Sequence, residues 1–411
     1  MTDELVVRHQ GEEVGRIRQN TDGGLVFTYA EAWLTSGFAL ARGLPLVTGP
    51  QPTDYFANLL PEDRARSRIA KRVGISAGND FAFLALFGRD CAASLEIAPV
   101  DDDAKPAPSD EGIWFLNDDD GIQLSTKTGF ADFFAEERVR LSLAGAQNKL
   151  AVVVDDDGRV GVPLDGRPST HILKLPNPDY KGLVENEAVM LDMARRLGLD
   201  VVHHSIVTLG KTRLLLIERY DRRRAGGQVT RLHQQDLCQA LGLPPDLKYE
   251  AEGGPSLADV FNLVRDEVDD PLDAAQQLLS WVAFNVVAHN ADAHAKNVSL
   301  VRDDEGGQRM APFYDLVCTG AYDLDHRMAM AVGGQADPGY IGTKQWAQFA
   351  SDVGVGKALV TRVATTMADG LMGAFSDAAA AFEEEVGRIP RRAQLEKVLR
   401  KRARKTLQLL A

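Results

Sequence analysis

The chain has 411 residues and a formal net charge of −13, with 45% hydrophobic and 26% charged residues. This composition is typical of a globular protein with two or three domains. The excess of acidic residues argues against a broad nucleic-acid-binding surface over the whole chain. The three cysteines are far apart and odd in number, which excludes a disulfide framework and indicates a reducing compartment. We expect a cytoplasmic protein without membrane association, because we find neither a signal-peptide pattern nor an apolar run of membrane-spanning length.

An acidic, proline-rich stretch at residues 99–112 separates the first quarter of the sequence from the rest. Its composition predicts a linker or a long loop. The preceding segment opens with a strand-like pattern at 4–10 and carries a helical pattern at 55–74. We therefore expect a small N-terminal domain at residues 1–105.

Strand patterns dominate the next segment, residues 112–230. The runs lie at 139–145, 149–154, 159–164, 170–176, 203–209 and 213–221. The sequence DDDG at 155–158 predicts a tight hairpin between two of these strands. One helix is predicted at 185–199, where Gly198 is a stop signal.

The remainder, residues 231–411, has mostly helical patterns. Ser256 is a suitable N-cap for one helix, and Pro271 is suited to the first turn of the next. The helix after Pro271 is apolar on nearly all sides, which predicts that it is buried. A β-rich part followed by a helical part suggests a cleft between two lobes.

The buried helix is followed abruptly by a polar stretch, NADAHAKN at residues 290–297. Asp292 and Asn297 are five residues apart, and Asp315 follows 18 residues later, where we expect a strand. Phosphoryl transfer needs a carboxylate to orient and deprotonate the acceptor hydroxyl. It also needs an amide and a second carboxylate to hold Mg²⁺ on the phosphates. The order Asp, Asn, Asp is that of protein kinases, and it predicts Asp292 as the base and Asn297 and Asp315 as metal ligands.

The β-rich part offers the other groups of a kinase site. Lys174 lies within an apolar strand, where an unpaired ammonium group is costly. The helix that follows offers Glu187 or Glu185 as its ion-pair partner. A turn at 142–149 could place backbone N–H groups over phosphates. It matches neither the Walker A motif nor the glycine-rich loop of ordinary protein kinases, since only Gly145 is present.

These residues also have ordinary structural interpretations. Lys174 could be an edge-strand lysine with its charge in water, Asp315 a turn residue, and Glu187 a solvated acid in the first turn of a helix. The turn at 142–149 could be a plain hairpin. Their order along one chain favours phosphoryl transfer.

A zinc site is the competing chemistry for the polar stretch, because His289 and His294 are five residues apart. On a helix this spacing directs the two side chains about 140° apart, so they cannot share one ion. We find no third cluster of ligands to complete such a site.

The end of the sequence departs from the acidic balance. Nine Lys/Arg residues and one acid, Glu396, lie between Arg388 and Lys405. They form either the solvated basic face of a terminal helix or a contact for DNA phosphates or an acidic partner.

The sequence resembles the HipA family of serine/threonine toxin kinases, which belong to type II toxin–antitoxin pairs. The resemblance covers nearly the whole chain and is far more specific than any one motif. Its stretches are YFANLLPEDRARSRIAKR, SLAGAQNKLAV, STHILKLP, ENE, IERYDRR, RLHQQDLCQALGLP, KYEAEGGP, NADAHAKN and APFYD. It implies an α+β, two-lobed protein-kinase-like fold related to phosphatidylinositol kinases. The domains would be an extra N-terminal module (1–105), a kinase N-lobe (112–230) and a helical C-lobe (231–411).

The resemblance also implies roles for individual residues, with ATP and Mg²⁺ as cofactors. Asp292 matches the catalytic base, Ser142 the family's autophosphorylation site, and Lys174 a contact to the phosphates. The other expected nucleotide contacts are Ala144, Gly145, Ala146, Gln147, Asn148 and Lys149 in the turn, Glu218, Arg219 and Tyr220 at the adenine hinge, and His294, Lys296, Asn297, Tyr314 and Asp315 near the nucleotide and Mg²⁺.

The implied activity is phosphorylation of an aminoacyl-tRNA synthetase, most often the glutamyl enzyme, which stops translation and growth. The implied partners are a HipB-like helix-turn-helix antitoxin and, mainly through it, operator DNA, where the pair represses transcription. Two alternatives stay open. One is a small-molecule or lipid kinase on the same fold, and the other is a non-toxic corepressor that strengthens operator binding by the antitoxin.

Overall fold

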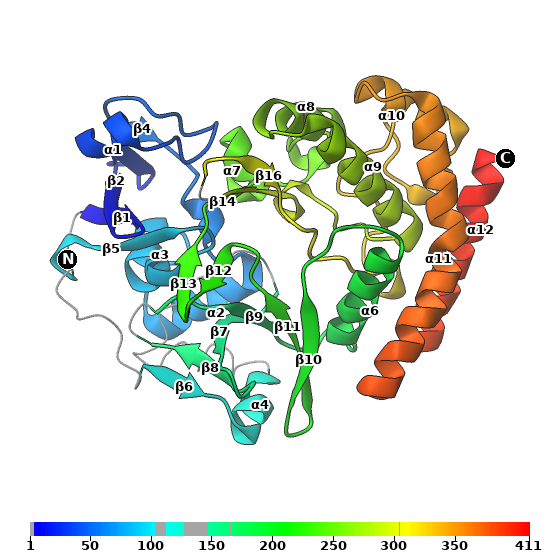
Figure 1. Cartoon of the computed structure of the whole chain (residues 1–411), viewed down its shortest axis with the longest axis horizontal. Helices are drawn as coiled ribbons and strands as arrows, with labels where there is room; N and C mark the ends of the chain where they lie inside the picture. Colours follow the sequence, from blue (N-terminus) through cyan, green and yellow to red (C-terminus); the bar gives the residue numbers. More distant parts are fainter. Residues whose placement is uncertain (1–3, 103–111, 127–146, 165–166, 304) are drawn as a thin grey trace. The chain divides into compact units, whose positions relative to one another are not determined.

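The computed structural model describes residues 4–102, 112–126, 147–164, 167–303 and 305–411. The chain forms two compact units (Figure 1). Unit 1 comprises Met1–Pro178, His204–Pro245 and Val301–Asp304, and unit 2 comprises Asp179–His203, Asp246–Leu300 and Glu305–Ala411. The three domains expected from the sequence stay predictions. Among the helices that the structure describes, none is long and apolar enough to cross a membrane.

Unit 1 contains a five-stranded antiparallel sheet built from the N-terminal part of the chain. Its order is β4-β3-β2-β1-β5, with bounds Gln51–Pro52, Leu25–Tyr29, Glu12–Gln19, Glu4–His9 and Leu95–Pro99. Three helices share one apolar core with this sheet, namely α1 (Glu31–Ser36), α2 (Asp63–Val73) and α3 (Asp80–Phe87). The strand predicted at 4–10 is therefore confirmed, whereas the helical pattern at 55–74 forms an α-helix only over Asp63–Val73.

A second sheet of unit 1 has six strands in the order β10-β11-β9-β7-β8-β6. Their bounds are β6 Ile113–Phe115, β7 Lys149–Val154, β8 Val160–Pro163, β9 His171–Lys174, β10 His204–Leu209 and β11 Thr212–Glu218. The predicted hairpin joins β7 to β8, where Asp155 Oδ1 accepts the N–H of Arg159 (2.8 Å) and Gly158 has φ +79°. Glycine adopts this left-handed conformation without steric cost, so the turn closes tightly. Helix α4 (Asp118–Leu124) lies beside β10.

The rest of unit 1 follows β11. Strands β12 (Arg222–Ala225) and β13 (Gln228–Arg231) pair as a hairpin, and strand β14 (Gln234–Asp236) leads directly into α7 (Leu237–Leu241). The side chain of Asp236 caps α7 by accepting the N–H of Gln239 at 2.8 Å.

Unit 2 is mostly helical. Its helices are α6 (Leu183–Arg196), α8 (Leu257–Glu267), α9 (Pro271–Ala288), α10 (Thr343–Asp352), α11 (Lys357–Glu385) and α12 (Arg392–Leu410). The predicted N-cap is confirmed, since Ser256 Oγ accepts the N–H of Asp259 at 3.2 Å. Helix α9 starts at Pro271, as predicted, and its last eight residues are all buried. Figure 1 shows α11 (orange) and α12 (red) side by side at the end of the chain.

The placement of Asp315 on a strand, predicted from the sequence, is wrong. Short strands β15 (Ser299–Arg302) and β16 (Gln308–Met310) precede it, and Phe313 forms an isolated bridge with Val201. Asp315 itself lies outside these elements with φ +54°. This left-handed conformation cannot continue an extended strand, so the chain turns at the residue that the predicted site needs.

Candidate active site

Helix α9 positions a polar loop, residues 289–297, which we call the catalytic loop. The helix ends where His289 adopts a left-handed conformation (φ +57°). The N–H of the next residue, Asn290, returns to the carbonyl of Asn285 at 2.9 Å. Arg402 of α12 donates to the carbonyl of Val286 at 3.4 Å, in the last turn of α9. A buried cation at a helix C-terminus is favourable because of the helix dipole, so α12 helps to fix the start of the loop.

Two asparagine side chains bring the predicted residues together. Asn290 donates from Nδ2 to Asn285 Oδ1 (2.9 Å) and to the backbone carbonyl of Asp315 (3.2 Å). Asn297 donates from Nδ2 to the backbone carbonyl of Asp292 at 2.9 Å. These contacts hold the Asn297 amide and the backbones of Asp292 and Asp315 in one local cluster within unit 2.

The exposure of these groups suits a reaction at the surface of unit 2. The Asp292 side chain is 57% exposed, whereas Asn297 is buried. Tyr314, another predicted residue, donates its hydroxyl to the carbonyl of Lys296 (2.8 Å) and lies 2.6 Å from Ser299 Oγ. The loop is therefore internally fixed, while its key carboxylate can meet an acceptor from solution.

His294 is buried in the catalytic loop and is neutral at pH 7. Burial lowers its pKa to about 3, with further lowering by Lys248 and Lys296, while Asp315 raises it. Its Nε2 lies 4.0 Å from Asp292 Oδ1, which is too far for a hydrogen bond.

No group of three or more His, Cys, Asp and Glu side chains within the described ranges could hold a metal ion. Of the two histidines of the zinc alternative, His289 packs its ring against that of His326, with centroids 5.0 Å apart. His294 packs edge-on against Tyr249 at 5.3 Å. Both rings are thus used in packing, which does not support the zinc alternative.

In unit 1, two predicted lysines face each other across the second sheet. Lys149 of β7 is the register partner of Lys174 of β9, and Lys174 is only 3% exposed. Like charges directly opposite each other are unfavourable, so a negatively charged group beside the pair would stabilise it. Leu175 donates its N–H to the carbonyl of Asn148 (3.0 Å) and accepts from Gln147 Nε2 (3.4 Å), which fixes the described end of the predicted phosphate turn. Ser142, Ala144, Gly145 and Ala146 lie outside the described residues.

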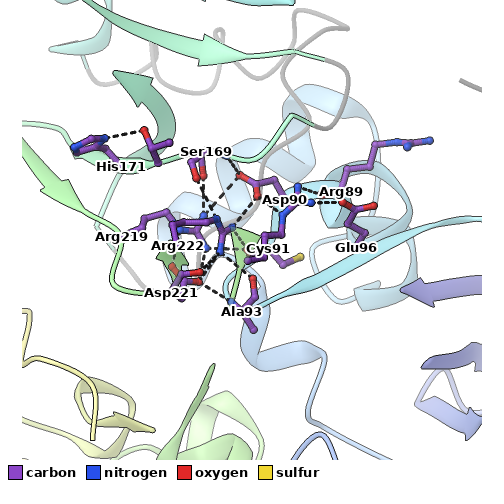
Figure 2. A network of polar contacts seen from close by, with 12 residues as sticks. Arg89, Asp90, Cys91, Ala93, Glu96, Ser169, His171, Arg219, Asp221 and Arg222 are labelled. Atoms are coloured by element: carbon purple, nitrogen blue, oxygen red, sulfur yellow. Dashed lines mark hydrogen bonds and ion pairs between the residues drawn. The ribbon is translucent and has the colours of Figure 1, made fainter. Parts of the chain in front are cut away.

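The predicted adenine hinge continues into a buried charge network, shown in Figure 2, which consists of Asp90, Arg219, Asp221 and Arg222. Arg219 donates to both oxygens of Asp221 (2.9 and 2.7 Å), and Arg222 donates to Asp90 at 2.8 Å and to Asp221 at 2.9 Å. The backbone N–H of Ser169 also donates to Asp90 (3.1 Å). The network therefore joins the end of the N-terminal part of the chain to the segment after β11.

The three predicted hinge residues have different surroundings. The Arg219 side chain is committed to the network and also donates to Ser169 Oγ at 2.8 Å. Glu218 is exposed at the end of β11, and Tyr220 donates its hydroxyl to Gln234 Oε1 at 2.8 Å. Because the Arg219 side chain is engaged in the network, a nucleotide contact from this segment would have to come from Glu218, Tyr220 or the backbone.

The predicted ion pair of Lys174 stays a prediction, because Lys174 belongs to unit 1 and both candidate glutamates belong to α6 of unit 2. Glu187 is fully buried and Glu185 is 8% exposed. Burial of Glu187 does not fit the alternative interpretation of this residue as a solvated acid.

Comparison with known proteins identifies two family regions. Residues 5–98 match the HipA N-terminal domain, and residues 141–376 match the HipA-like C-terminal domain. The chain is 40% identical over 383 residues to "Putative kinase Y4mE" of Sinorhizobium fredii, covering 89% of each chain. It is 32% identical over 363 residues to "Serine/threonine-protein kinase toxin HipA" of Shewanella oneidensis, covering 83% of this chain and 81% of that one.

A solved structure gives a similar result. The HipA chain of the Shewanella oneidensis "Toxin Antitoxin System HipA, HipB and its operator DNA complex" matches with a TM-score of 0.81 and 27% identity, covering 98% of each chain. This match confirms the predicted α+β, two-lobed kinase-like fold.

Proposed function

This chain belongs to the HipA family of kinases, and on that premise we propose that it transfers the γ-phosphoryl group of ATP to a serine or threonine of a target protein. The observation that carries the proposal is the catalytic loop. Asn297 ties its amide to the Asp292 backbone, and Asn290 ties the loop to Asp315. Asp292 is then the exposed base that orients and deprotonates the acceptor hydroxyl.

The residues of the loop fit Mg²⁺. The contact from Asn297 uses its Nδ2, which leaves Oδ1 for a ligand. The backbone of Asp315 is held to the loop by Asn290, and its charge acts on His294 of the loop. Mg²⁺ prefers a few such oxygen ligands together with water and nucleotide phosphates. When bound, the ion would neutralise charge on the phosphates. In unit 1, Lys149 and Lys174 would bind phosphate oxygens.

The relatives support a proposal for the biological role. HipA of Shewanella oneidensis is named a toxin kinase, and HipA of that organism is solved with HipB and operator DNA. We infer that this chain is the toxin of a toxin–antitoxin pair, that a HipB-like antitoxin binds it, and that the pair represses its own operator. An aminoacyl-tRNA synthetase, with the glutamyl enzyme as first choice, is the proposed substrate, and its phosphorylation would arrest translation.

The test compares wild type with Asp292→Asn, using Asp325→Asn as a control for an exposed acid of the same unit. Labelled ATP with Mg²⁺ should phosphorylate one purified synthetase of the host, and Asp292→Asn should lower the rate at least about 100-fold. Induced expression should arrest growth for wild type and Asp325→Asn alone. Near-full activity of Asp292→Asn would refute the assignment of the base. Growth arrest without phosphorylation of a protein would favour the corepressor alternative. Labelling of a lipid or a small molecule would favour a lipid or small-molecule kinase.

A further inference from the structure

Tyr249 contacts the proposed base directly, although no step above gives it a role. Its hydroxyl donates to Asp292 Oδ1 at 2.7 Å, within unit 2. A carboxylate has two oxygens with about four acceptor positions, and this bond takes one of them. The Asp292 side chain is 57% exposed, and an exposed side chain loses rotamer freedom when it is held in one orientation.

The ring of Tyr249 is held by its neighbours. His294 packs edge-on against it with centroids 5.3 Å apart, and Lys248 Nζ lies 5.4 Å from the ring centroid. The N–H of Gly254 returns to the Tyr249 carbonyl at 2.9 Å, which closes a turn at Gly253 with φ +95°. A hydroxyl on so restrained a ring has a defined position, so it can fix the carboxylate that accepts from it.

The backbone around Tyr249 is also tied to the catalytic loop by a separate route. The N–H of Glu250 donates to the carbonyl of Ala329 (3.0 Å), and Glu250 Oε2 accepts the N–H of Ala331 (2.6 Å). Ala329 in turn donates its N–H to the carbonyl of Ala291, which precedes Asp292 (2.8 Å). The side-chain bond and this backbone route connect the same two segments, so Tyr249 and Asp292 keep a fixed separation.

We propose that Tyr249 is the positioning residue of the base, and that it holds Asp292 Oδ1 so that Oδ2 faces the acceptor hydroxyl. The inference rests on the proposed function of Asp292. His294 cannot take this role, because its Nε2 is 4.0 Å from Oδ1. The tyrosine acts only through Asp292, and it contributes by keeping the base within reach of the proton that it removes.

Tyr249→Phe tests the proposal because it keeps the ring and removes only the hydroxyl. ADP formation from Mg²⁺ and ATP by the full chain is the readout, since it counts transfer to any acceptor, including water. We expect kcat to fall about tenfold, because a misplaced base loses part of a contribution of about 10²–10⁴-fold. The KM for ATP, the thermal stabilisation by ATP and the Tm without nucleotide should match wild type. Tyr340→Phe, in an exposed part of the same unit, is the matched control.

Three outcomes would overturn the role of Tyr249. An unchanged kcat would show that the hydroxyl positions nothing, and a raised kcat would show that it blocks the acceptor. A fall in kcat that tracks a lower Tm or weaker ATP binding would show a structural role. Asp292→Asn is measured beside it, so that full activity of Asp292→Asn identifies failure of the proposed function. Loss in Asp292→Asn with wild-type rates in Tyr249→Phe identifies failure of this inference alone.

Discussion

The buried charge network of unit 1 and the catalytic loop of unit 2 use ionic groups in opposite ways. In the network, two carboxylates and two guanidinium groups face one another, and each of the four side chains is at most 6% exposed. In the loop, the Asp292 carboxylate is 57% exposed and is held by a neutral phenol. The first arrangement compensates its charges internally, and the second leaves a charge available for chemistry.

This difference predicts whether a substitution should affect stability or activity. Removing one member of a buried, balanced set leaves an uncompensated charge in the interior, which is strongly destabilising. Removing an exposed carboxylate costs much less, because solvent screens its charge. Changes in the network should therefore lower stability, and changes in the loop should lower the reaction rate or ligand binding.

The largest expected effect comes from Asp90→Asn. This change leaves Arg222 and its neighbours without the carboxylate that they share, and should cost about 3–5 kcal/mol of unfolding free energy. Denaturant unfolding measures it, with soluble yield as the readout if the variant does not fold. Asp155→Asn is the matched control, because Asp155 pairs with Arg159 at the surface and should change stability little. Equal stability of the two variants would contradict the structural role of the network.

Asp315→Ala tests the other side of the comparison. Loss of this carboxylate should remove most of the thermal stabilisation by Mg²⁺ and ATP, which is about 2.7 kcal/mol at a ligand concentration 100 times Kd. The Tm without ligand should change much less than for Asp90→Asn. A thermal-shift titration measures both quantities, with Asp325→Ala as the exposed control. A wild-type shift in Asp315→Ala would place the metal elsewhere.

Local sequence patterns predicted much of the fold. Short apolar runs predicted strands such as β7 and β9, Ser256 and Pro271 marked helix starts, and the polar stretch after the buried helix forms a loop at the end of α9. Each of these features depends on residues close together in sequence, where periodicity and capping determine the conformation.

Pairings between distant residues could not be predicted in this way. Arg222 and Asp90 are 132 residues apart, and Tyr249 and Asp292 are 43 apart. The ERYDRR stretch shows alternating charges but not their partner, and Arg402 resembles the other basic residues of α12, although it is buried. Burial and pairing of these groups depend on the completed fold. The turn at Asp315 could not be predicted either, because the residues before it have a strand-like pattern.

The buried charge network should also make the free energy of unfolding depend on pH. Burial alone would raise the pKa of Asp90, but Arg222, Arg219 and Arg231 lower it to about 2. A carboxyl whose pKa is lower in the folded state than in the unfolded state stabilises the fold above the unfolded value, near 4, and loses this contribution as the pH falls. We expect a loss of about 2 kcal/mol between pH 4 and pH 2. Denaturant midpoints measured across this range should fall less steeply for Asp90→Asn. Parallel pH profiles would show that Asp90 does not carry the effect.

The smallest effect in free energy concerns control of nucleotide binding through Ser142. Ser142 lies seven residues before Lys149, which faces Lys174 across β7 and β9. In the proposed site, these two opposed lysines would bind phosphate oxygens of ATP. A phosphate on Ser142 would add a charge of about −1.5 to −2 that competes for the same cations and backbone N–H groups. We expect a second copy of the enzyme to phosphorylate Ser142, and the affinity for ATP to fall about tenfold, which is about 1.4 kcal/mol.

Mass spectrometry after incubation with ATP tests the modification, with Ser142→Ala as control, and titration of the singly modified protein tests the affinity. Unimpaired ATP binding by the modified protein would mean that the opposed lysines do not respond to this charge.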